Sequence, residues 1–343
     1  MTTPLVDTPL ARDAGVAVPL ICGPMYPCSN PELVGAVSRA GGLGAIQPAA
    51  LTFVHGYEFR AGVRHTLDLA GGMPVGMNAL IEGSNRRYRE RMEQWIEIAL
   101  EEGVRFFITS LGKPRWVVDR VAAVGGRVYH DVTERKWALK AVDSGVHGLI
   151  AVNRRAGGHA GPLDVRALLD DVGDLGLPVV CAGGIATAEG FAEALAMGYA
   201  GVQMGTRFIA TTECTAGAPY KEAILAARAD DVVLTERLTG VPVAVLNTPY
   251  VQRMGLRAGP LARRLLRGSR TKHWMRALYA LRSAWSLRKT AMDPRGRTAY
   301  WQAGKSVEDI TDIVPAGEVV EACARAAATP RQRTESDSTE KPA

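Results

Sequence analysis

The residues best suited to chemistry lie in one loop, residues 153–161, which reads NRRAGGHAG. His159 stands between small residues there, and an apolar run at 148–152 leads into the loop. Glycines let a backbone approach a ligand closely, because no Cβ stands in the way. An imidazole titrates near neutral pH and can act as a general base. The pattern therefore predicts a catalytic loop with His159 as its reactive group, the alternative being a histidine that only supports the structure.

Two further glycine turns, Gly183-Gly184 in CAGGI and Gly205-Thr206 in MGTRF, each follow a short apolar run. Such turns present backbone N–H groups to an anion, and Thr206 adds a hydroxyl donor. Either pair alone could simply make a tight turn. Together, after consecutive predicted strands, they predict a site for the phosphate of a nucleotide-type cofactor or of a phosphorylated substrate.

The other histidines and the cysteines give weaker indications of function. His130 ends a predicted strand, so it could face the same site or pack as a strand-end residue. The five cysteines contain no CxxC pair and are odd in number, so we predict neither a metal site nor a disulfide framework. Cys28 is expected to be a small buried hydrophobic side chain.

Short apolar runs alternate with longer amphipathic ones along the chain, as in strand–helix units. The eight predicted strands are 19–22, 43–46, 74–78, 105–109, 126–131, 147–152, 178–184 and 200–205. Helices fit between them, for example at 133–144 and 187–197. Eight such repeats predict an α/β fold, a (β/α)8 TIM barrel with a C-terminal helical addition. The alternative, a doubly wound sheet, usually carries G-x-G-x-x-G in its first turn, and this chain lacks that motif.

In a barrel the loops after the strands hold the site. The reactive groups are then expected in the loops or strand ends at Gly23–Cys28, Asn78, Ser110, Asp131, 153–161, Gly183-Gly184 and Gly205-Thr206.

Several segments between about residues 17 and 326 together resemble the nitronate monooxygenase family, formerly called 2-nitropropane dioxygenases. They are GPM, AVSRAGGLGAI, AGGHAGP, PVVCAGGIATAEGFAEALAMGYAGVQMGTRFIATTEC and YWQAGKS. The family includes FMN-dependent NAD(P)H:quinone reductases and flavin-type enoyl-acyl carrier protein reductases. The resemblance implies a TIM barrel that binds FMN without a covalent bond.

The resemblance also implies roles for individual residues. His159 matches the family's active-site histidine, proposed as a base or as a hydrogen-bond partner of the substrate's nitro group. The residues implied to contact FMN are Pro24, Met25 and Asn78 at the ring, Gly183, Gly184, Gly205 and Thr206 at the phosphate, and Gln302 and Gly304 in the late YWQAGK segment.

Two positions depart from the family pattern. Many members have an acid four residues before the histidine, where this chain has Arg155. Many carry a lysine after the fifth strand, where this chain has Asp131 or its neighbours. These changes leave the flavin site in place and leave the substrate open.

We expect three parts: a TIM-barrel FMN-binding core at 1–228, an extension at 229–326 that packs on the barrel and completes the flavin site, and a disordered polar tail at 327–343. The helical stretch 274–289 carries an apolar stripe that would pack on the barrel. Its alternative role is a lid over an acyl chain, or a patch that meets an acidic carrier protein or a membrane.

The net charge of +6 is uneven: residues 253–305 hold fourteen Lys or Arg and one acid, Asp293. This segment is either a solvated basic surface or a face for an anionic ligand. No recognition motif accompanies the charge, so no nucleic-acid partner is predicted. The chain has neither an 18-residue apolar run nor a signal-peptide pattern at its start, which predicts a cytoplasmic protein without a transmembrane segment. The oligomeric state is not indicated.

The sequence therefore predicts an FMN-dependent oxidoreductase of the nitronate monooxygenase type, which oxidises a nitronate or similar carbanion with O₂. The alternative is an NAD(P)H-dependent reductase of a quinone or of an enoyl-thioester carried by CoA or by acyl carrier protein. The third hypothesis is a flavin-binding barrel with little catalytic activity that acts as a scaffold or sensor.

Overall fold

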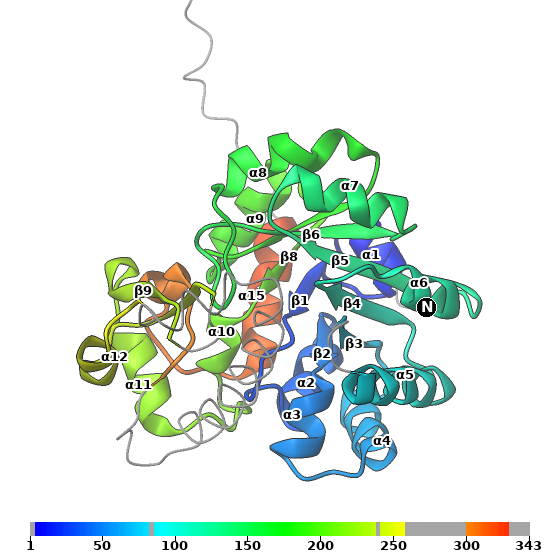
Figure 1. The fold of residues 1–343 in the computed structure, drawn as a ribbon, viewed down its shortest axis with the longest axis horizontal. Helices are drawn as coiled ribbons and strands as arrows, with labels where there is room; N and C mark the ends of the chain where they lie inside the picture. The colour runs from blue at the N-terminus through cyan, green and yellow to red at the C-terminus, as the bar shows by residue number, and fades with distance from the viewer. Residues whose placement is uncertain (1–3, 82–85, 238–240, 258–299, 329–343) are drawn as a thin grey trace, which may run out of the picture.

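A closed barrel of eight parallel strands forms the centre of the computed structural model, which describes residues 4–81, 86–237, 241–257 and 300–328 (Figure 1). The strands are β1 (Leu20–Cys22), β2 (Leu43–Ile46), β3 (Val75–Leu80), β4 (Phe106–Ser110), β5 (Arg127–Val132), β6 (Gly148–Val152), β7 (Val179–Ala182) and β8 (Gly201–Met204). Each strand pairs with the next, and β8 pairs with β1 to close the barrel. The predicted TIM barrel is confirmed, and every strand lies within two residues of its predicted bounds.

Helices surround the strands (Figure 1). They are α2 (Pro31–Arg39), α3 (Pro48–Phe53), α4 (Phe59–Ala70), α5 (Arg86–Glu101), α6 (Arg115–Ala122), α7 (Arg135–Asp143), α8 (Val165–Val172), which leads into the short 3₁₀ turn η1 (Gly173–Leu175), α9 (Ala188–Ala196) and α15 (Ala316–Ala328). The last of these, α15, packs against both α9 and α2. A helix from the end of the described chain thus covers the barrel beside β8.

Between β8 and α15 the chain forms smaller elements, which lie on the left in Figure 1. They are α10 (Thr206–Ile209), α11 (Ala218–Ala226), η2 (Ala229–Asp231), the antiparallel pair β9 (Val232–Thr235) and β10 (Val243–Leu246), α12 (Pro249–Met254) and η3 (Lys305–Asp309). The predicted helix at 274–289 and most of the basic segment lie outside the described residues. So does the predicted tail, except Ala327 and Ala328, which end α15.

The barrel interior is built in layers. Because the strands tilt, side chains at one height come from alternate strands. The strand register places Ile21, Gly76, Tyr129 and Val180 in one layer, Ala45, Ile108, Ile150 and Gln203 in the next, and Gly23, Asn78, Asp131 and Ala182 in the layer nearest the carboxyl ends. The apolar members of the two lower layers belong to one buried cluster, separate from the cluster beneath the helices. The layer nearest the carboxyl ends is therefore small and polar, whereas the layers below it are mainly apolar.

The opposite end of the barrel is closed by α1 (Pro9–Ala14). Asp13 on this helix accepts hydrogen bonds from the Tyr129 hydroxyl at 2.9 Å and from Arg127 Nε at 3.1 Å. Tyr129 is fully buried, and burial together with the Asp13 charge raises the pKa of its hydroxyl. This contact anchors α1 to β5 at the end of the barrel away from the candidate site.

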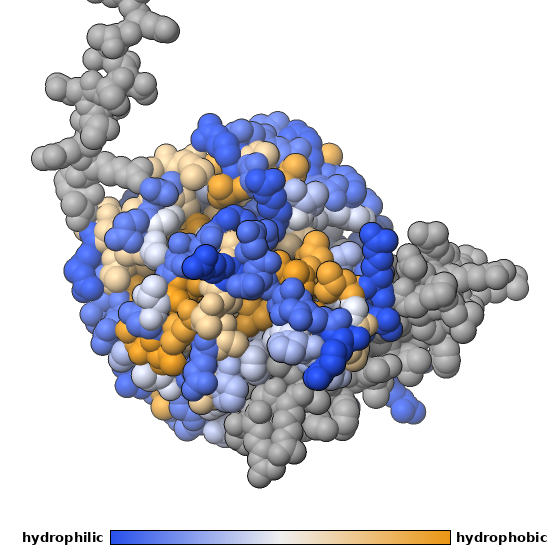
Figure 2. Space-filling model, turned by 90° about the vertical axis from the view of Figure 1, so that its left-hand side faces the viewer, coloured by the Kyte–Doolittle hydropathy of each residue, from blue (hydrophilic) through white to orange (hydrophobic). Residues whose placement is uncertain are grey.

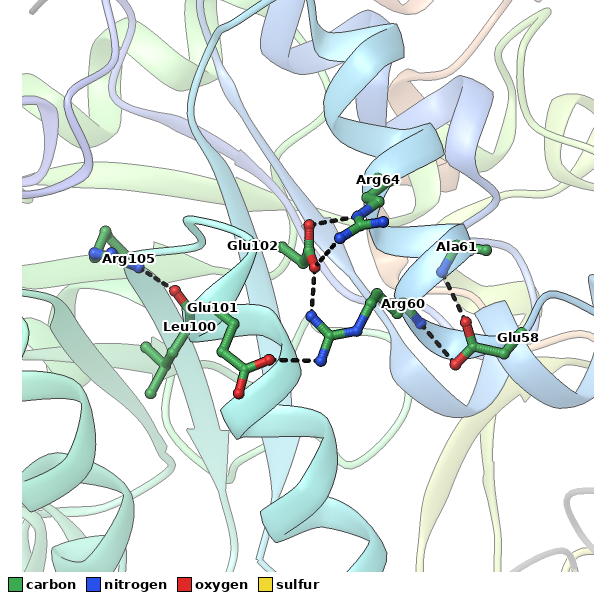
Figure 3. Close-up of polar contacts among 8 residues, drawn as sticks. All are labelled: Glu58, Arg60, Ala61, Arg64, Leu100, Glu101, Glu102 and Arg105. Atoms are coloured by element: carbon green, nitrogen blue, oxygen red, sulfur yellow. Dashed lines mark hydrogen bonds and ion pairs between the residues drawn. The ribbon is translucent and has the colours of Figure 1, made fainter.

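Charged residues join neighbouring helices on the outside, as Figure 3 shows for α4 and the end of α5. Arg60 contacts Glu101 and Glu102 at 2.5 Å each, and Arg64 Nε lies 2.7 Å from Glu102 Oε2. The two arginines lower the pKa of the Glu102 carboxyl. Among the described helices, none is both long and apolar enough to span a bilayer.

Candidate active site at the carboxyl ends of the strands

The loop after β6 is held by two segments from the far end of the chain. Ala244 N, on β10, donates to Gly158 O at 2.8 Å, and Lys305 N donates to Arg155 O at 2.8 Å. The 300–305 segment is in turn joined to β10 by a bridge between Gln302 and Val245. The predicted catalytic loop and the late YWQAGK segment therefore lie together.

Gly157 and Gly304 meet backbone to backbone. A Cβ on Gly304 would lie 2.8 Å from both Arg155 O and Gly157 N, and a Cβ on Gly157 would lie 2.9 Å from Gly304 N. No side chain fits at either position without a shift of the backbone. Gly157 thus allows the approach of another part of the chain, whereas the sequence suggested that this glycine leaves room for a ligand.

Asn153 fixes the base of the same loop and was not singled out from the sequence. Its side chain is fully buried, and its Nδ2 donates to Gly183 O at 2.8 Å while its Oδ1 accepts from Arg155 N at 2.8 Å. Asn153 therefore couples the loop after β6 to the glycine turn after β7. The available signal was its place as the first residue after a predicted strand.

The Gly183-Gly184 turn packs against the β6 loop. Both residues have positive φ, +111° and +77°, which side chains rarely adopt. A Cβ on Gly183 would lie 2.7 Å from Ala156 N, and a Cβ on Gly184 would lie 2.7 Å from Arg155 Nε. Both glycines are therefore required by the local packing, whatever their backbone N–H groups bind.

The second predicted phosphate turn joins the first at this end of the barrel. Gly205 precedes α10, and a Cβ on it would lie 3.5 Å from Met25 Sδ in the loop after β1. Thr206 is buried, and its Oγ1 accepts a hydrogen bond from Gly304 N at 3.0 Å. Its hydroxyl proton remains available for an anion. The structure thus brings Met25, Gly205, Thr206 and Gly304 together.

The polar layer of the barrel contains two acceptors without a donor. Asp131 Oδ1 and Gln203 Oε1 are buried and have no hydrogen-bond partner among the described residues. Burial raises the pKa of the Asp131 carboxyl to about 7. Asn78, also buried, lies at the height of Asp131. Orphaned buried acceptors are costly, so this layer is suited to a ligand that brings its own donors.

The two histidines of interest have different surroundings. His130 faces away from the barrel interior, because strand residues alternate and its neighbour Tyr129 belongs to the inner cluster. Its Nδ1 lies 2.8 Å from Thr109 Oγ1, and burial lowers its pKa to about 4. Of the two alternatives for His130, the packed strand-end residue agrees with the structure. Asp131, the next residue, faces inward.

His159 keeps an exposed ring, yet the surrounding protein excludes enough water to lower the pKa of its imidazole. The neutral form of the imidazole is therefore favoured more than in an ordinary histidine. Figure 2 shows the face of the molecule on the left of Figure 1, where patches of hydrophobic residues lie among hydrophilic ones. An imidazole whose neutral form is favoured is suited to proton transfer with a weakly acidic organic substrate.

Arg155 replaces an acid that the family pattern often has, and it forms an ion pair with Glu308 in η3. Its guanidinium thus holds the late segment against the catalytic loop. Of the other predicted site residues, Gln302 accepts the Tyr220 hydroxyl at its main-chain oxygen, and Pro24 follows Gly23 at the barrel mouth. Cys28 is buried, as predicted.

The closed eight-stranded barrel with helices around it places this protein in the TIM-barrel class of α/β folds, and the candidate site residues gather in the loops after its strands. The chain belongs to the nitronate monooxygenase family, because the family model of that description matches residues 8–325. The resemblance found in the sequence is confirmed, and the protein is an oxidoreductase.

Three known proteins illustrate the range of the similarity. The chain is 33% identical over 245 residues to (3aS,4S,5R,7aS)-5-hydroxy-7a-methyl-1-oxo-octahydro-1H-indene-4-carboxyl-CoA dehydrogenase of Rhodococcus jostii, covering 71% of this chain and 67% of that protein. It is 30% identical over 272 residues to a nitronate monooxygenase of Pseudomonas aeruginosa, covering 67% and 76%. The structure of FabK from Thermotoga maritima superposes with a TM-score of 0.75 at 25% identity, covering 94% and 96%.

Proposed function

We propose that this protein is an FMN-dependent oxidoreductase that oxidises a nitronate or a similar carbanion with O₂. The observation that carries the proposal is the lowered pKa of His159 in a loop that packs directly on the Gly183-Gly184 turn and contacts Gly304, the residue that donates to Thr206. Bound FMN would take electrons from the substrate and pass them to O₂. The chain's part is to hold the cofactor, orient the substrate and handle its proton.

The residues at the barrel mouth fit a flat polar ring. Gly23 lets the Gln203 side chain lie close to the main chain, since a Cβ on Gly23 would lie 3.1 Å from Gln203 Cγ. The buried oxygens Asp131 Oδ1 and Gln203 Oε1 have no donor among the described residues and can accept hydrogen bonds from a ligand. An isoalloxazine has an N–H group and carbonyl oxygens along one edge, which suit these oxygens and the amide of Asn78. We assign the ring to this mouth, beside Pro24 and Met25.

The phosphate would lie at the two glycine turns. We assign it to the backbone N–H groups of Gly183, Gly184 and Gly205 and to the Thr206 hydroxyl, with Gln302 and Gly304 completing the wall from the late segment. Thr206 supports this assignment because its hydroxyl already accepts from Gly304 and so points its proton elsewhere.

His159 would accept the substrate's carbon-bound proton or hydrogen-bond its nitro oxygens. A neutral imidazole can do either, with one ring nitrogen accepting and the other donating. Because the pKa of His159 is lowered, the neutral form persists to more acidic pH than for an ordinary histidine. The acid limb of kcat/KM should therefore lie below the ordinary histidine pKa of about 6.5.

A second candidate is an NAD(P)H-dependent reductase of a quinone or of an enoyl-thioester. It is favoured by the Rhodococcus relative, whose name specifies a carboxyl-CoA substrate. Anaerobic mixing of the yellow protein with NADH, NADPH and an alkyl nitronate in turn separates the two. Fast bleaching by a pyridine nucleotide and none by the nitronate would favour the reductase.

The phosphate assignment is tested by comparing FMN with riboflavin, which lacks the phosphate. Thr206→Val should weaken FMN binding several-fold more than riboflavin binding, whereas Thr206→Ser, which keeps the hydroxyl, should change neither by much. If Thr206→Val loses equal affinity for FMN and for riboflavin, the phosphate does not bind at Thr206.

The role of His159 is tested by His159→Ala. Its FMN content should stay near that of the wild type, and turnover should fall by about 10²–10⁴, the usual cost of a positioned acid–base group. His65→Ala, on the covering helix α4, is the matched control and should keep full activity. Wild-type turnover in His159→Ala would show that His159 has only a structural role.

A further inference from the structure

Asp131 holds an unusual position in the barrel. It lies on the inward face of β5 at the height of Gly23, Asn78 and Ala182, and its Oδ1 is buried with no hydrogen-bond partner among the described residues. A carboxyl so placed contributes nothing visible to the packing of the barrel. It faces the mouth, where a ligand would meet it.

Nearby polar groups do not satisfy this carboxyl. Gln203 Oε1 in the layer below also lacks a hydrogen-bond donor. The rest of that layer is Ala45, Ile108 and Ile150, which are apolar and buried. Burial without a donor disfavours the ionised carboxylate, so the surroundings favour the neutral form of Asp131.

No described charge compensates the ionised form either. Arg154 and Arg155, on the loop after β6, are ion-paired with Asp164 and Glu308, and His159 on the same loop has a lowered pKa. Burial is the single cause of the raised pKa of Asp131, about 7.

Two other cations come from neighbouring loops. Arg207, after β8, is held by Asp312 at 2.8 Å, and Lys113, after β4, is exposed to solvent. The protonation of Asp131 is therefore poised near neutral pH and open to control by a charge that arrives with a ligand.

We propose that Asp131 is a proton-coupling residue beneath the redox ring: its carboxylate takes a proton from water when the ring is reduced and releases it when the ring is oxidised. The inference rests on the proposed function, which puts a flavin at the barrel mouth. The two electrons come from the reductant, the ring takes up the N–H proton that its own two-electron reduction requires, and one further proton from water ends on the Asp131 carboxyl. Added negative charge close to a buried carboxylate raises its proton affinity.

The experiment uses the purified holoprotein, and its flavin content is measured first, because a protein that binds no flavin refutes the proposed function itself. The reduction potential is then measured by dithionite titration between about pH 5.5 and 9, in the wild type, Asp131→Asn and Asp119→Asn. The last variant removes the same charge from the exposed surface of α6.

In the wild type we expect a segment above about pH 7 where the potential falls more steeply than in Asp131→Asn. The difference should approach one proton for two electrons, a tenfold change per pH unit or about 30 mV per unit. At pH below about 6 the two slopes should agree, because the carboxyl is then neutral in both redox states. Asp119→Asn should follow the wild type, and coincident slopes in all three flavin-loaded proteins would overturn the proposal.

A second measurement needs no variant that might misfold. The reduced-minus-oxidised infrared difference spectrum of the wild type at pH 8 should contain a carboxylic acid C=O band that shifts in D₂O. With flavin bound and reduced, absence of this band would refute the uptake of a proton by Asp131, while leaving the flavin site itself intact.

Discussion

Gly304→Ala should disturb the site through a single methyl group. Gly304 has φ −92° and ψ 168°, which any residue adopts, so the substitution adds no backbone strain of its own. Its new Cβ would lie 2.8 Å from Arg155 O and from Gly157 N, both main-chain atoms that cannot rotate away. The late segment and the β6 loop must therefore move apart by several tenths of an ångström.

The cost follows from what that movement strains. Overpacking typically costs 1–3 kcal/mol. Two hydrogen bonds are also at risk, Gly304 N to Thr206 Oγ1 at 3.0 Å and Lys305 N to Arg155 O at 2.8 Å, at about 0.5–1.5 kcal/mol each. We expect a loss of about 2–6 kcal/mol, which lowers the melting temperature by roughly 4–12 °C at about 2 °C per kcal/mol.

The assay is thermal unfolding of Gly304→Ala beside Gly317→Ala, with FMN content and turnover measured on the same samples. A Cβ on Gly317, in α15, would lie 3.7 Å from the Ala40 Cβ, an ordinary contact, so this control should melt near the wild type or slightly above it. Turnover of Gly304→Ala should fall because the loop that carries His159 moves. A melting temperature and turnover within error of the wild type would refute the idea that this contact positions the loop.

Three further changes test other parts of the structure. Tyr129→Phe removes the 2.9 Å hydrogen bond to Asp13 and should lower the free energy of unfolding by about 1.5–3 kcal/mol at unchanged turnover; an unchanged midpoint in urea would contradict an anchoring role for α1. Because the folded pKa of Asp131 is raised to about 7, the free energy of unfolding of the wild type should fall by at most about 4 kcal/mol as pH rises from about 4 to 7. Asp131→Asn should lack this loss. Melting temperatures that follow parallel pH curves in the two proteins would refute the expectation. Because the folded pKa of the Glu102 carboxyl is lowered, its contribution to the free energy of unfolding should be present above the ordinary glutamate pKa and vanish in acid. The small destabilisation in Glu102→Gln should therefore disappear at low pH and in 1 M salt. A difference in stability that persists under both conditions would contradict the ion-pair explanation.

The sequence by itself determined the architecture. Short strands that are mainly apolar, such as 148–152, alternate with amphipathic helices. This pattern is local, because burial on both faces makes most residues of a parallel strand apolar. The helix after β1 begins at Pro31, whose fixed φ suits the first helical position. Asn30, the residue before it, makes no side-chain cap bond, and its Nδ2 donates to Glu213 O at 2.8 Å, a contact that depends on the fold.

Only the tertiary structure decided which neighbours the reactive residues have. His130 and Asp131 are adjacent at the end of β5, and alternation puts them on opposite faces, but the register around the closed barrel is what turns Asp131 inward. Gly157 and Gly304 are far apart in the chain, so their contact depends on how the last described segment folds back over the barrel. A few neighbouring residues are enough to encode a strand or a turn. The contact between Gly157 and Gly304 and the buried carboxyl of Asp131 arise only when segments distant in the chain pack together and exclude water.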